Sequence, residues 1–314
     1  MKGIIVKSTG KWYSVLSEKK ERIRCRIKGK FKLEGLHLTN PVAVGDQVEF
    51  VPEKNLNTAI ISKILPRKNY ILRQSTHRRH FMQLIASNLD QVVLIATLKY
   101  PSLKLGFIDR FLLTSESHNI PTYLVVNKAD LYTEADLELY YGVRAIYERI
   151  GYKTILTSAQ NGRGIDQLKT LLKDKTTLIS GHSGVGKSTL TNAIQPSLNL
   201  ATQEISLSSQ KGMHTTTFAE MHALDFGGSL IDTPGIKEFG FINMSPQDVA
   251  HNFKEFFEHS INCKFGNCLH MNEPKCAVKK AVENGEISDL RYQSYRSIQD
   301  EVATRNYWER QTDW

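Results

Sequence analysis

The sequence predicts a multidomain α/β protein with a small β-barrel, a three-layer α/β domain and a helical C-terminal domain. Three observations predict this fold class. Residues 1–68 hold five short strand patterns, residues 90–232 alternate buried strand patterns with amphipathic helix patterns, and residues 243–314 are helical in pattern around a cysteine and histidine cluster. We therefore expect domains at residues 1–68, 69–242 and 243–314.

Length and composition are those of a globular protein. The 314 residues suffice for two or three domains of about 100–200 residues each. Hydrophobic residues make up 40% and charged residues 23% of the chain, which excludes an intrinsically disordered protein. The apolar run at residues 92–98 is far shorter than the roughly 20 residues that span a bilayer, and residues 1–7 lack the apolar stretch of a secretory signal. We expect no membrane association.

The first 80 residues are strongly basic. They contain 18 Lys and Arg against 6 Asp and Glu, a net charge of +12, whereas the whole chain carries +9 and the remainder therefore −3. A basic excess confined to one segment is the footprint expected for nucleic-acid binding. A charge run is often only a solvated face, so composition leaves both interpretations open.

The barrel prediction depends on strand patterns in this basic segment. Residues 22–27 alternate, with Arg22, Arg24 and Arg26 on one face and apolar residues, including Cys25, on the other. The other strand patterns cover residues 4–6, 11–16, 45–50 and 58–64. Five strands with one basic face suit an OB-type barrel, which commonly binds oligonucleotides. Any small β-barrel with a solvated cationic face is the alternative.

Residues 69–81 are expected to form a basic linker after the barrel. The basic side chains are Arg73, His77, Arg78, Arg79 and His80. Nucleic-acid contact and a plain solvated connector are both compatible with this segment.

A glycine-rich motif lies between a buried strand pattern and a helix pattern. It consists of Gly181, His182, Ser183, Gly184, Val185, Gly186, Lys187, Ser188 and Thr189. Strand, G-x-x-x-x-G-K-S and helix in this order are the context that a phosphate-binding loop requires. The glycines let backbone N–H groups converge on phosphate oxygens, and the helix N-terminus adds a positive dipole. We expect Lys187 to reach the β- and γ-phosphates of a nucleoside triphosphate and Ser188 to bind Mg²⁺.

Two motifs at the ends of other strand patterns indicate guanine as the base. The first consists of Asn127, Lys128, Ala129 and Asp130, and the second of Ser158 and Ala159. A carboxylate at Asp130 can accept hydrogen bonds from guanine N1–H and the N2 amino group, whereas adenine has no donor at N1. Asn127 can contact the base or neighbouring loops, Lys128 can cover the base plane, and the backbone at residues 158–159 can donate to guanine O6.

The order of these motifs predicts a circular permutation. In Ras-like GTPases the phosphate loop comes first and the base-reading motifs last. Here the base-reading motifs precede Gly181, and the sequence Asp-Thr-Pro-Gly at residues 232–235 follows it. The amphipathic pattern at residues 164–173 would then be the last helix of the ordinary order, joined directly to the phosphate-loop strand.

Two stretches after the phosphate loop resemble the switches that sense the γ-phosphate. Residues 203–217 end in His-Thr-Thr-Thr, and one of Thr215, Thr216 and Thr217, with Thr216 as the candidate, is expected to contact GTP and Mg²⁺. Asp232 is expected to hold Mg²⁺ through water, and the Gly235 N–H to meet the γ-phosphate.

The group that orients the attacking water is less evident. Ile236 stands where Ras-like enzymes carry a glutamine, and a hydrophobic side chain cannot orient water. His214 is the candidate catalytic residue, with an ordinary turn histidine as the alternative. We expect slow intrinsic turnover that a partner accelerates.

The C-terminal region holds a metal-like cluster of Cys263, Cys268, His270 and Cys276. Three thiolates and one imidazole within 14 residues form a closed set suited to one structural Zn²⁺, with free thiols as the alternative. Three of the four cysteines lie in this cluster, which favours metal in a reducing cytoplasm over a disulfide framework.

Helix patterns flank this cluster at residues 245–259, 276–284 and 288–308. The last of them carries Arg291, Tyr292, Tyr295 and Arg296, for which RNA contact and helix packing are both possible interpretations.

Together these motifs resemble the circularly permuted GTPases of small ribosomal subunit biogenesis, also called ribosome small subunit-dependent GTPase A. The resemblance spans nearly the whole chain, from the barrel through the permuted motifs to the C-x4-C-x-H-x5-C cluster. It implies GTP hydrolysis stimulated by the 30S subunit, 16S rRNA contact, late 30S maturation and a monomeric cytoplasmic enzyme with Mg²⁺ and one Zn²⁺. Action on another RNA, or a nucleotide-dependent clamp with incidental turnover, are the alternatives.

Overall fold

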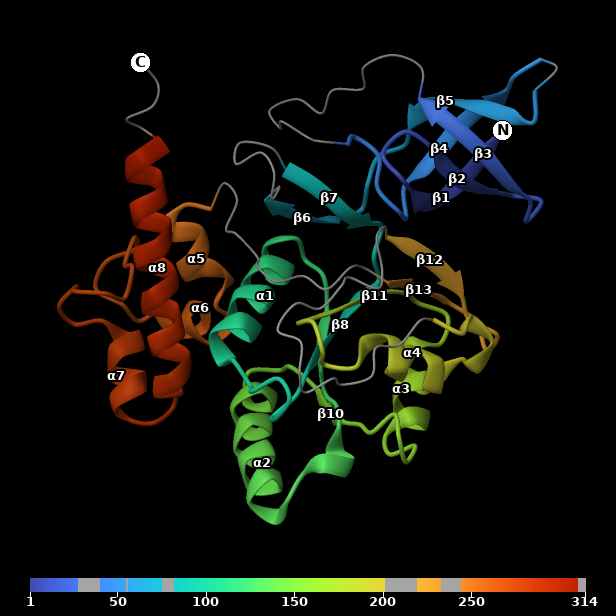
Figure 1. Cartoon of the computed structure of the whole chain (residues 1–314). Coiled ribbons are helices and arrows are strands. Elements are labelled where there is room, and N and C mark those ends of the chain that lie inside the picture. The colour runs from blue at the N-terminus through green and yellow to red at the C-terminus, as the bar shows by residue number, and fades with distance from the viewer. Residues whose placement is uncertain (28–39, 55, 75–81, 201–218, 233–243, 310–314) are drawn as a thin grey trace.

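The computed structural model describes residues 1–27, 40–54, 56–74, 82–200, 219–232 and 244–309 (Figure 1). An 11-stranded sheet of order β10-β9-β8-β11-β13-β12-β1-β2-β3-β5-β4 runs from the central domain into the N-terminal barrel. A helical region lies on the other side of the central domain (Figure 1). The three predicted architectures are therefore present, and the barrel and the central domain share one continuous hydrogen-bonded sheet.

The N-terminal barrel has five strands. They are β1 Lys2–Ser8, β2 Tyr13–Ser17, β3 Arg22–Ile27, β4 Gln47–Pro52 and β5 Thr58–Ile64. Strand β4 pairs with β1 as well as β5, which closes the barrel, and β3 runs parallel to β5. The predicted alternation in β3 is confirmed, because Cys25 is buried with the barrel core while Arg22, Arg24 and Arg26 are exposed. This closed five-strand arrangement matches the OB-type prediction.

A β-hairpin follows the barrel where the sequence suggested a linker. Strand β6 Tyr70–Gln74 pairs antiparallel with β7 Met82–Ser87. Ile71 is fully buried and Leu72 packs with Leu84. The apolar residues of this segment are therefore part of a core, which its basic composition does not indicate. The linker prediction is therefore wrong for residues 70–74, and His77, Arg78, Arg79 and His80 lie outside the described residues.

Among the described residues, the central domain has a six-stranded sheet of order β10-β9-β8-β11-β13-β12, in which only β12 is antiparallel to its neighbour β13. Its strands are β8 Gln91–Ala96, β9 Thr122–Val126, β10 Thr154–Leu156, β11 Thr176–Gly181, β12 Glu220–Ala223 and β13 Ser229–Asp232. Its helices are α1 Leu105–Ser117, η1 Ala129–Leu131, α2 Glu134–Arg149, α3 Ile165–Leu172, α4 Lys187–Ile194 and η2 Pro196–Leu198.

Alternate residues of the central strands face two different helix layers. Val92 and Leu94 of β8 share a core with α1 and α2, whereas Val93 and Ile95 share a second core with α3 and α4. Period-two alternation of wholly apolar strands is what a sheet covered on both faces requires. The predicted three-layer architecture is confirmed.

The described part of the C-terminal region, residues 244–309, contains four helices. They are α5 Pro246–Asn252, α6 Lys254–Ser260, α7 Ala277–Glu283 and α8 Asp289–Glu309. The single helix predicted for residues 245–259 is broken at Phe253, whose backbone is extended and whose buried ring packs against Phe256 and Tyr295. Insertion of this ring into the core outweighs continuation of the helix. None of the described helices combines the length and apolar character that a membrane crossing needs.

The side chains of α8 for which RNA contact was one interpretation have mostly structural contacts. Arg291 and Tyr295 are buried, and Tyr292 is half-buried with its hydroxyl donating to the His270 carbonyl oxygen at 2.8 Å. Packing therefore accounts for these three, while Arg296 is exposed.

Candidate nucleotide and metal sites

The phosphate-loop motif forms a tight turn between β11 and α4. Gly181 has φ of +149°, and a Cβ there would lie 2.3 Å from the Ile95 carbonyl oxygen of the neighbouring strand. Gly186 has φ of +89°, and its Cβ would lie 2.7 Å from Asn127 Nδ2. Both positions require glycine for conformation and for space. The loop is thus pressed against β8 and against the base-reading motif.

Lys187 lies inside this loop. Its Nζ donates to the carbonyl oxygens of Gly181 and His182, both at 2.9 Å. Burial lowers the pKa of Lys187 to about 8, and the nearby Asp232 carboxylate opposes that shift. An ammonium held in a desolvated loop lacks full compensation for its charge, so an anionic ligand here would stabilise it.

Asn127 joins the base-reading motif to the phosphate loop. Its Nδ2 donates to the Val185 carbonyl oxygen at 3.0 Å, and its Oδ1 accepts a hydrogen bond from the Thr157 hydroxyl at 3.0 Å. Of the two roles expected for this side chain, the structure therefore shows contact with neighbouring loops. Val185 itself is buried in the core, so only its backbone faces the site.

The remaining base-reading residues are arranged around Asp130. Its carboxylate is exposed to solvent and accepts a hydrogen bond from the Ser158 hydroxyl at 2.5 Å. The Ser158 N–H already donates to the Arg163 carbonyl oxygen, which leaves the Ala159 N–H as the candidate donor to guanine O6. Lys128 is half-buried, and its backbone has the left-handed helical conformation. Its Nζ donates to the Tyr100 carbonyl oxygen at 2.5 Å. Burial lowers the pKa of Lys128.

The candidate magnesium ligands lie at the carboxyl ends of adjacent strands. Asp232 ends β13 and is in register with Ile179 of β11, the strand that leads into Ser188. Ser183, Gly184 and Thr189 are exposed at the same edge. Ligands of open α/β sheets bind at this edge, so the arrangement can hold a phosphate chain and its cation.

Several predicted contacts lie outside the described residues. These are His214, Thr215, Thr216, Thr217, Gly235 and Ile236. Their roles stay predictions.

The four predicted metal ligands come together in the C-terminal region. Their ligand atoms all lie within 4.8 Å of one another, and His270 Nδ1 lies 3.4 and 3.7 Å from the sulfurs of Cys276 and Cys263. A tetrahedral zinc with bonds of about 2.0–2.3 Å needs ligand separations of about 3.3–3.8 Å, so this set fits a structural zinc ion.

Neighbouring groups orient these ligands. The Ala277 and Lys279 N–H groups donate to the sulfurs of Cys263 and Cys276 at 3.3 and 3.4 Å. Such bonds favour thiolates, the form that binds metal. Tyr295 of α8 also donates to the Leu269 carbonyl oxygen at 2.6 Å, so the last helix fixes the ligand loop.

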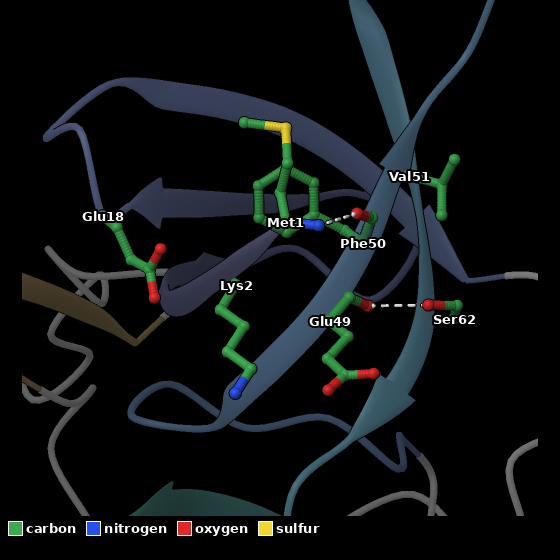
Figure 2. A pocket seen from close by; sticks show the side chains of 7 residues that line it. All are labelled: Met1, Lys2, Glu18, Glu49, Phe50, Val51 and Ser62. Atoms are coloured by element: carbon green, nitrogen blue, oxygen red, sulfur yellow. Dashed lines mark hydrogen bonds between the residues drawn. The ribbon is translucent and has the colours of Figure 1, made fainter.

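A hollow of about 430 Å³ lies elsewhere, on the barrel (Figure 2). It is lined by Met1, Lys2, Glu18, Glu49, Phe50, Val51 and Ser62, and the Met1 ammonium donates to the Phe50 carbonyl oxygen at 3.0 Å. None of the motif residues lines it, so it is separate from both candidate sites.

Sequence reasoning missed three contributors to the nucleotide site. Thr157 supports Asn127, Tyr100 accepts from Lys128, and the Tyr132 hydroxyl accepts from the Leu98 N–H and donates to the Asn127 carbonyl oxygen. Thr157 could have been found, since it directly precedes the motif of Ser158 and Ala159. Nothing in the local sequence marks Tyr100 or Tyr132.

The strand order and the site together define a circularly permuted GTPase. The strands bearing the base-reading motifs precede the phosphate-loop strand in sequence but flank it on one side of the sheet, while β13 and β12 flank it on the other. Residues 64–242 match the family model for the RsgA GTPase, and residues 2–61 match that for the RsgA N-terminal domain. The chain belongs to the RsgA GTPase family and is a GTP-hydrolysing enzyme.

Relatives and solved structures agree with this assignment. The small ribosomal subunit biogenesis GTPase RsgA of Flavobacterium psychrophilum is 51% identical over 95% of this chain and 92% of its own length. The protein of the same name from Bacteroides fragilis is 46% identical over 98% of this chain and 99% of its own. The crystal structure of YjeQ from Thermotoga maritima superposes with a TM-score of 0.76 at 37% identity, covering 96% of this chain and 98% of that one. YloQ, described as a circularly permuted GTPase, gives 0.72 at 31% identity, covering 97% and 95%.

Proposed function

We propose that this enzyme hydrolyses GTP at the carboxyl edge of its central sheet and acts in late maturation of the 30S ribosomal subunit. The hydrogen bond between Asn127 and the Val185 carbonyl oxygen carries the first part, because it joins the base-reading motif to the phosphate loop. The names of its relatives as small ribosomal subunit biogenesis GTPases support the second.

In this proposal Lys187 turns from the Gly181 and His182 carbonyl oxygens toward the β- and γ-phosphates. Ser188 and Asp232 would hold Mg²⁺, and this cation would supply positive charge beside the transferring phosphoryl group. Thr216 and the Gly235 N–H complete the γ-phosphate contacts, and His214 orients the attacking water. The other loop residues, Gly181 to Thr189, supply backbone donors.

Guanine is selected by Asp130, with the Ser158 hydroxyl orienting its carboxylate. Replacement of Asp130 by Asn removes an acceptor for guanine N1–H and adds a donor that suits the O2 of xanthine. Asp130→Asn should weaken GTP binding by about 100-fold or more and strengthen XTP binding. Asp166→Asn, an exposed carboxylate on α3, is the matched control. Equal loss of affinity for both nucleotides would contradict the assigned role.

The RNA-binding part of the proposal rests on the barrel. The Arg24 guanidinium lies 3.9 Å from the centroid of the Trp12 ring, on a face that also carries Arg22 and Arg26. A stacked cation and aromatic ring suit nucleic-acid backbone and bases, and 16S rRNA is the proposed target.

One structural Zn²⁺, held by the three cysteines and His270, supports the C-terminal region. We propose a monomeric, cytoplasmic enzyme.

GTP turnover with purified 30S subunits, with 50S subunits and with neither tests this function. We expect stimulation by 30S subunits alone, on the order of a hundredfold or more. No stimulation by either subunit would contradict the 30S proposal and favour another RNA. If His214→Ala abolished turnover but not nucleotide binding, and cells carrying it still matured 30S subunits normally, the clamp alternative would replace an enzymatic role.

A further inference from the structure

Helix α1 contacts the phosphate loop near its N-terminal end. The ring of Phe107 lies against the ring of His182, with centroids 3.9 Å apart and planes inclined by 38°. His182 Nε2 is buried and has no hydrogen-bond partner among the described residues. Burial lowers the pKa of His182, with further lowering from Lys104 and Lys187. The ring therefore packs on Phe107 and forms a side-chain contact between the phosphate loop and this helix.

The same helix is fixed to the C-terminal helices through buried charges. Asp109 Oδ1 accepts from Arg291 NH1 of α8 at 2.7 Å and from the Tyr147 hydroxyl at 2.7 Å. Arg291 also binds both carboxylate oxygens of Glu255 on α6, at 2.7 and 3.0 Å. Burial lowers the pKa of Arg291, but Asp109 and Glu255 outweigh burial and the net shift is upward, so the guanidinium stays charged.

Two further contacts extend this attachment along α1. Arg110 pairs with Glu301 of α8 at 3.0 Å, where both side chains are partly exposed. Leu113 is buried in the C-terminal core, whereas Phe111 and Leu112 are buried in the core of the central sheet. Helix α1 therefore belongs to both cores. It lies between the C-terminal helices and the central sheet (Figure 1).

Phe107 and Asp109 are two residues apart, about 3 Å along the helix axis. A helix moves as a stiff element over such a distance, so a displacement of α8 that shifts Asp109 also shifts Phe107. We propose that Phe107 and His182 are positioning residues for the phosphate loop, and that α1 couples this loop to the C-terminal helices through Arg291 and Glu301. By linkage, a partner that displaces α8 changes nucleotide affinity, and nucleotide changes affinity for that partner by the same factor.

This inference rests on the proposed function, because the coupled property is guanine-nucleotide binding. The test is a double-mutant cycle with Phe107→Leu and Glu301→Gln in the full-length protein. The dissociation constants for fluorescent GDP and GTP analogues, kcat and KM, and the midpoint of thermal unfolding are measured for each variant. Asp300→Asn is the matched control, since it removes a carboxylate from an exposed position of the same helix.

We expect Glu301→Gln to change nucleotide affinity about fivefold or more, although Glu301 lies on α8 and not in the nucleotide site. A change of this size is at the low end of typical allosteric coupling. The double variant should then fall outside the sum of the single effects, and Asp300→Asn should bind as wild type. A lower unfolding midpoint with unchanged dissociation constants in both single variants would overturn the coupling and leave the proposed function standing. Wild-type protein that bound neither GDP nor GTP would overturn both.

Discussion

The barrel and the C-terminal helices are attached to the same central domain by different physical means. On the barrel side, β1 meets β12 at Lys7 and Glu220, and Glu220 forms ion pairs with Lys7 and Arg22 at 2.6 and 3.5 Å. The two basic side chains are 42% and 57% exposed. On the C-terminal side, the Arg291, Asp109 and Glu255 side chains are at most 6% exposed.

Salt can therefore weaken the ion pairs between β1 and β12, whereas it should hardly affect the buried Arg291, Asp109 and Glu255 group. Exposed ion pairs are screened by salt and stabilise little, whereas a buried pair is hardly screened and is costly to break from one side. A phosphate backbone can also compete with Glu220 for Lys7 and Arg22. A second barrel contact, between Asp46, Arg67 and Ser87, is buried but lies before β8, at the end of that strand away from the nucleotide loops.

Removal of the metal should have the largest effect, and on one region only. Structural zinc contributes on the order of 10 kcal/mol in small domains, so Cys263→Ser or chelation should unfold the C-terminal helices and leave the barrel folded. Hydrogen exchange by region and metal analysis measure this, with one zinc per chain expected in the wild type. Cys25→Ser, at a barrel-core thiol, should retain the metal. Equal loss of hydrogen-exchange protection in the barrel and in the C-terminal helices would contradict the prediction that the metal stabilises only the C-terminal region.

Loss of the buried Arg291 guanidinium should have the second-largest effect. Arg291→Met leaves Asp109 and Glu255 as buried carboxylates without their guanidinium, so the free energy of unfolding should fall by about 3–5 kcal/mol. Urea denaturation measures the change, and the loss should persist at high salt. Arg296→Met, at an exposed position of the same helix, should cost little. Similar values for the two variants would show that burial does not distinguish this attachment.

The smallest effect is expected at the barrel seam. Glu220→Gln removes the partner of Lys7 and Arg22, and the free energy of unfolding should fall by roughly 1 kcal/mol or less. Because salt screens the pairs, the difference from wild type should vanish near 1 M salt. Parallel denaturation series at low and high salt test this, with Glu18→Gln at an exposed turn as control. A salt-independent loss would mean that the seam resembles the buried attachment.

Local signals were enough to predict the barrel, the permuted sheet and the gathering of the Cys263, Cys268, His270 and Cys276 side chains. The glycine-rich motif and the strand-end motifs are flanked by recognisable strand and helix patterns, and Gly186 and Asn127 do lie together in one site. The attachments depended on long-range pairing that no local pattern marks. Arg291 and Asp109 are 182 residues apart in sequence, and a basic residue in a helix pattern is usually assigned to the surface. The same limit concealed the β6–β7 hairpin, whose apolar residues find partners only after folding.

The pairing of β1 with β12 also affects whether copies of this protein can associate through the edges of their sheets. Strand β12 is the last strand of the central sheet on that side, and without the barrel its outer backbone groups would be available to another chain's strand. It has only four residues, and β1 occupies its Glu220 end. Short, covered edges are a recognised protection against intermolecular strand pairing. Strand β1 thus covers the Glu220 end of this edge, and we expect a chain trimmed of its first domain to lose that cover.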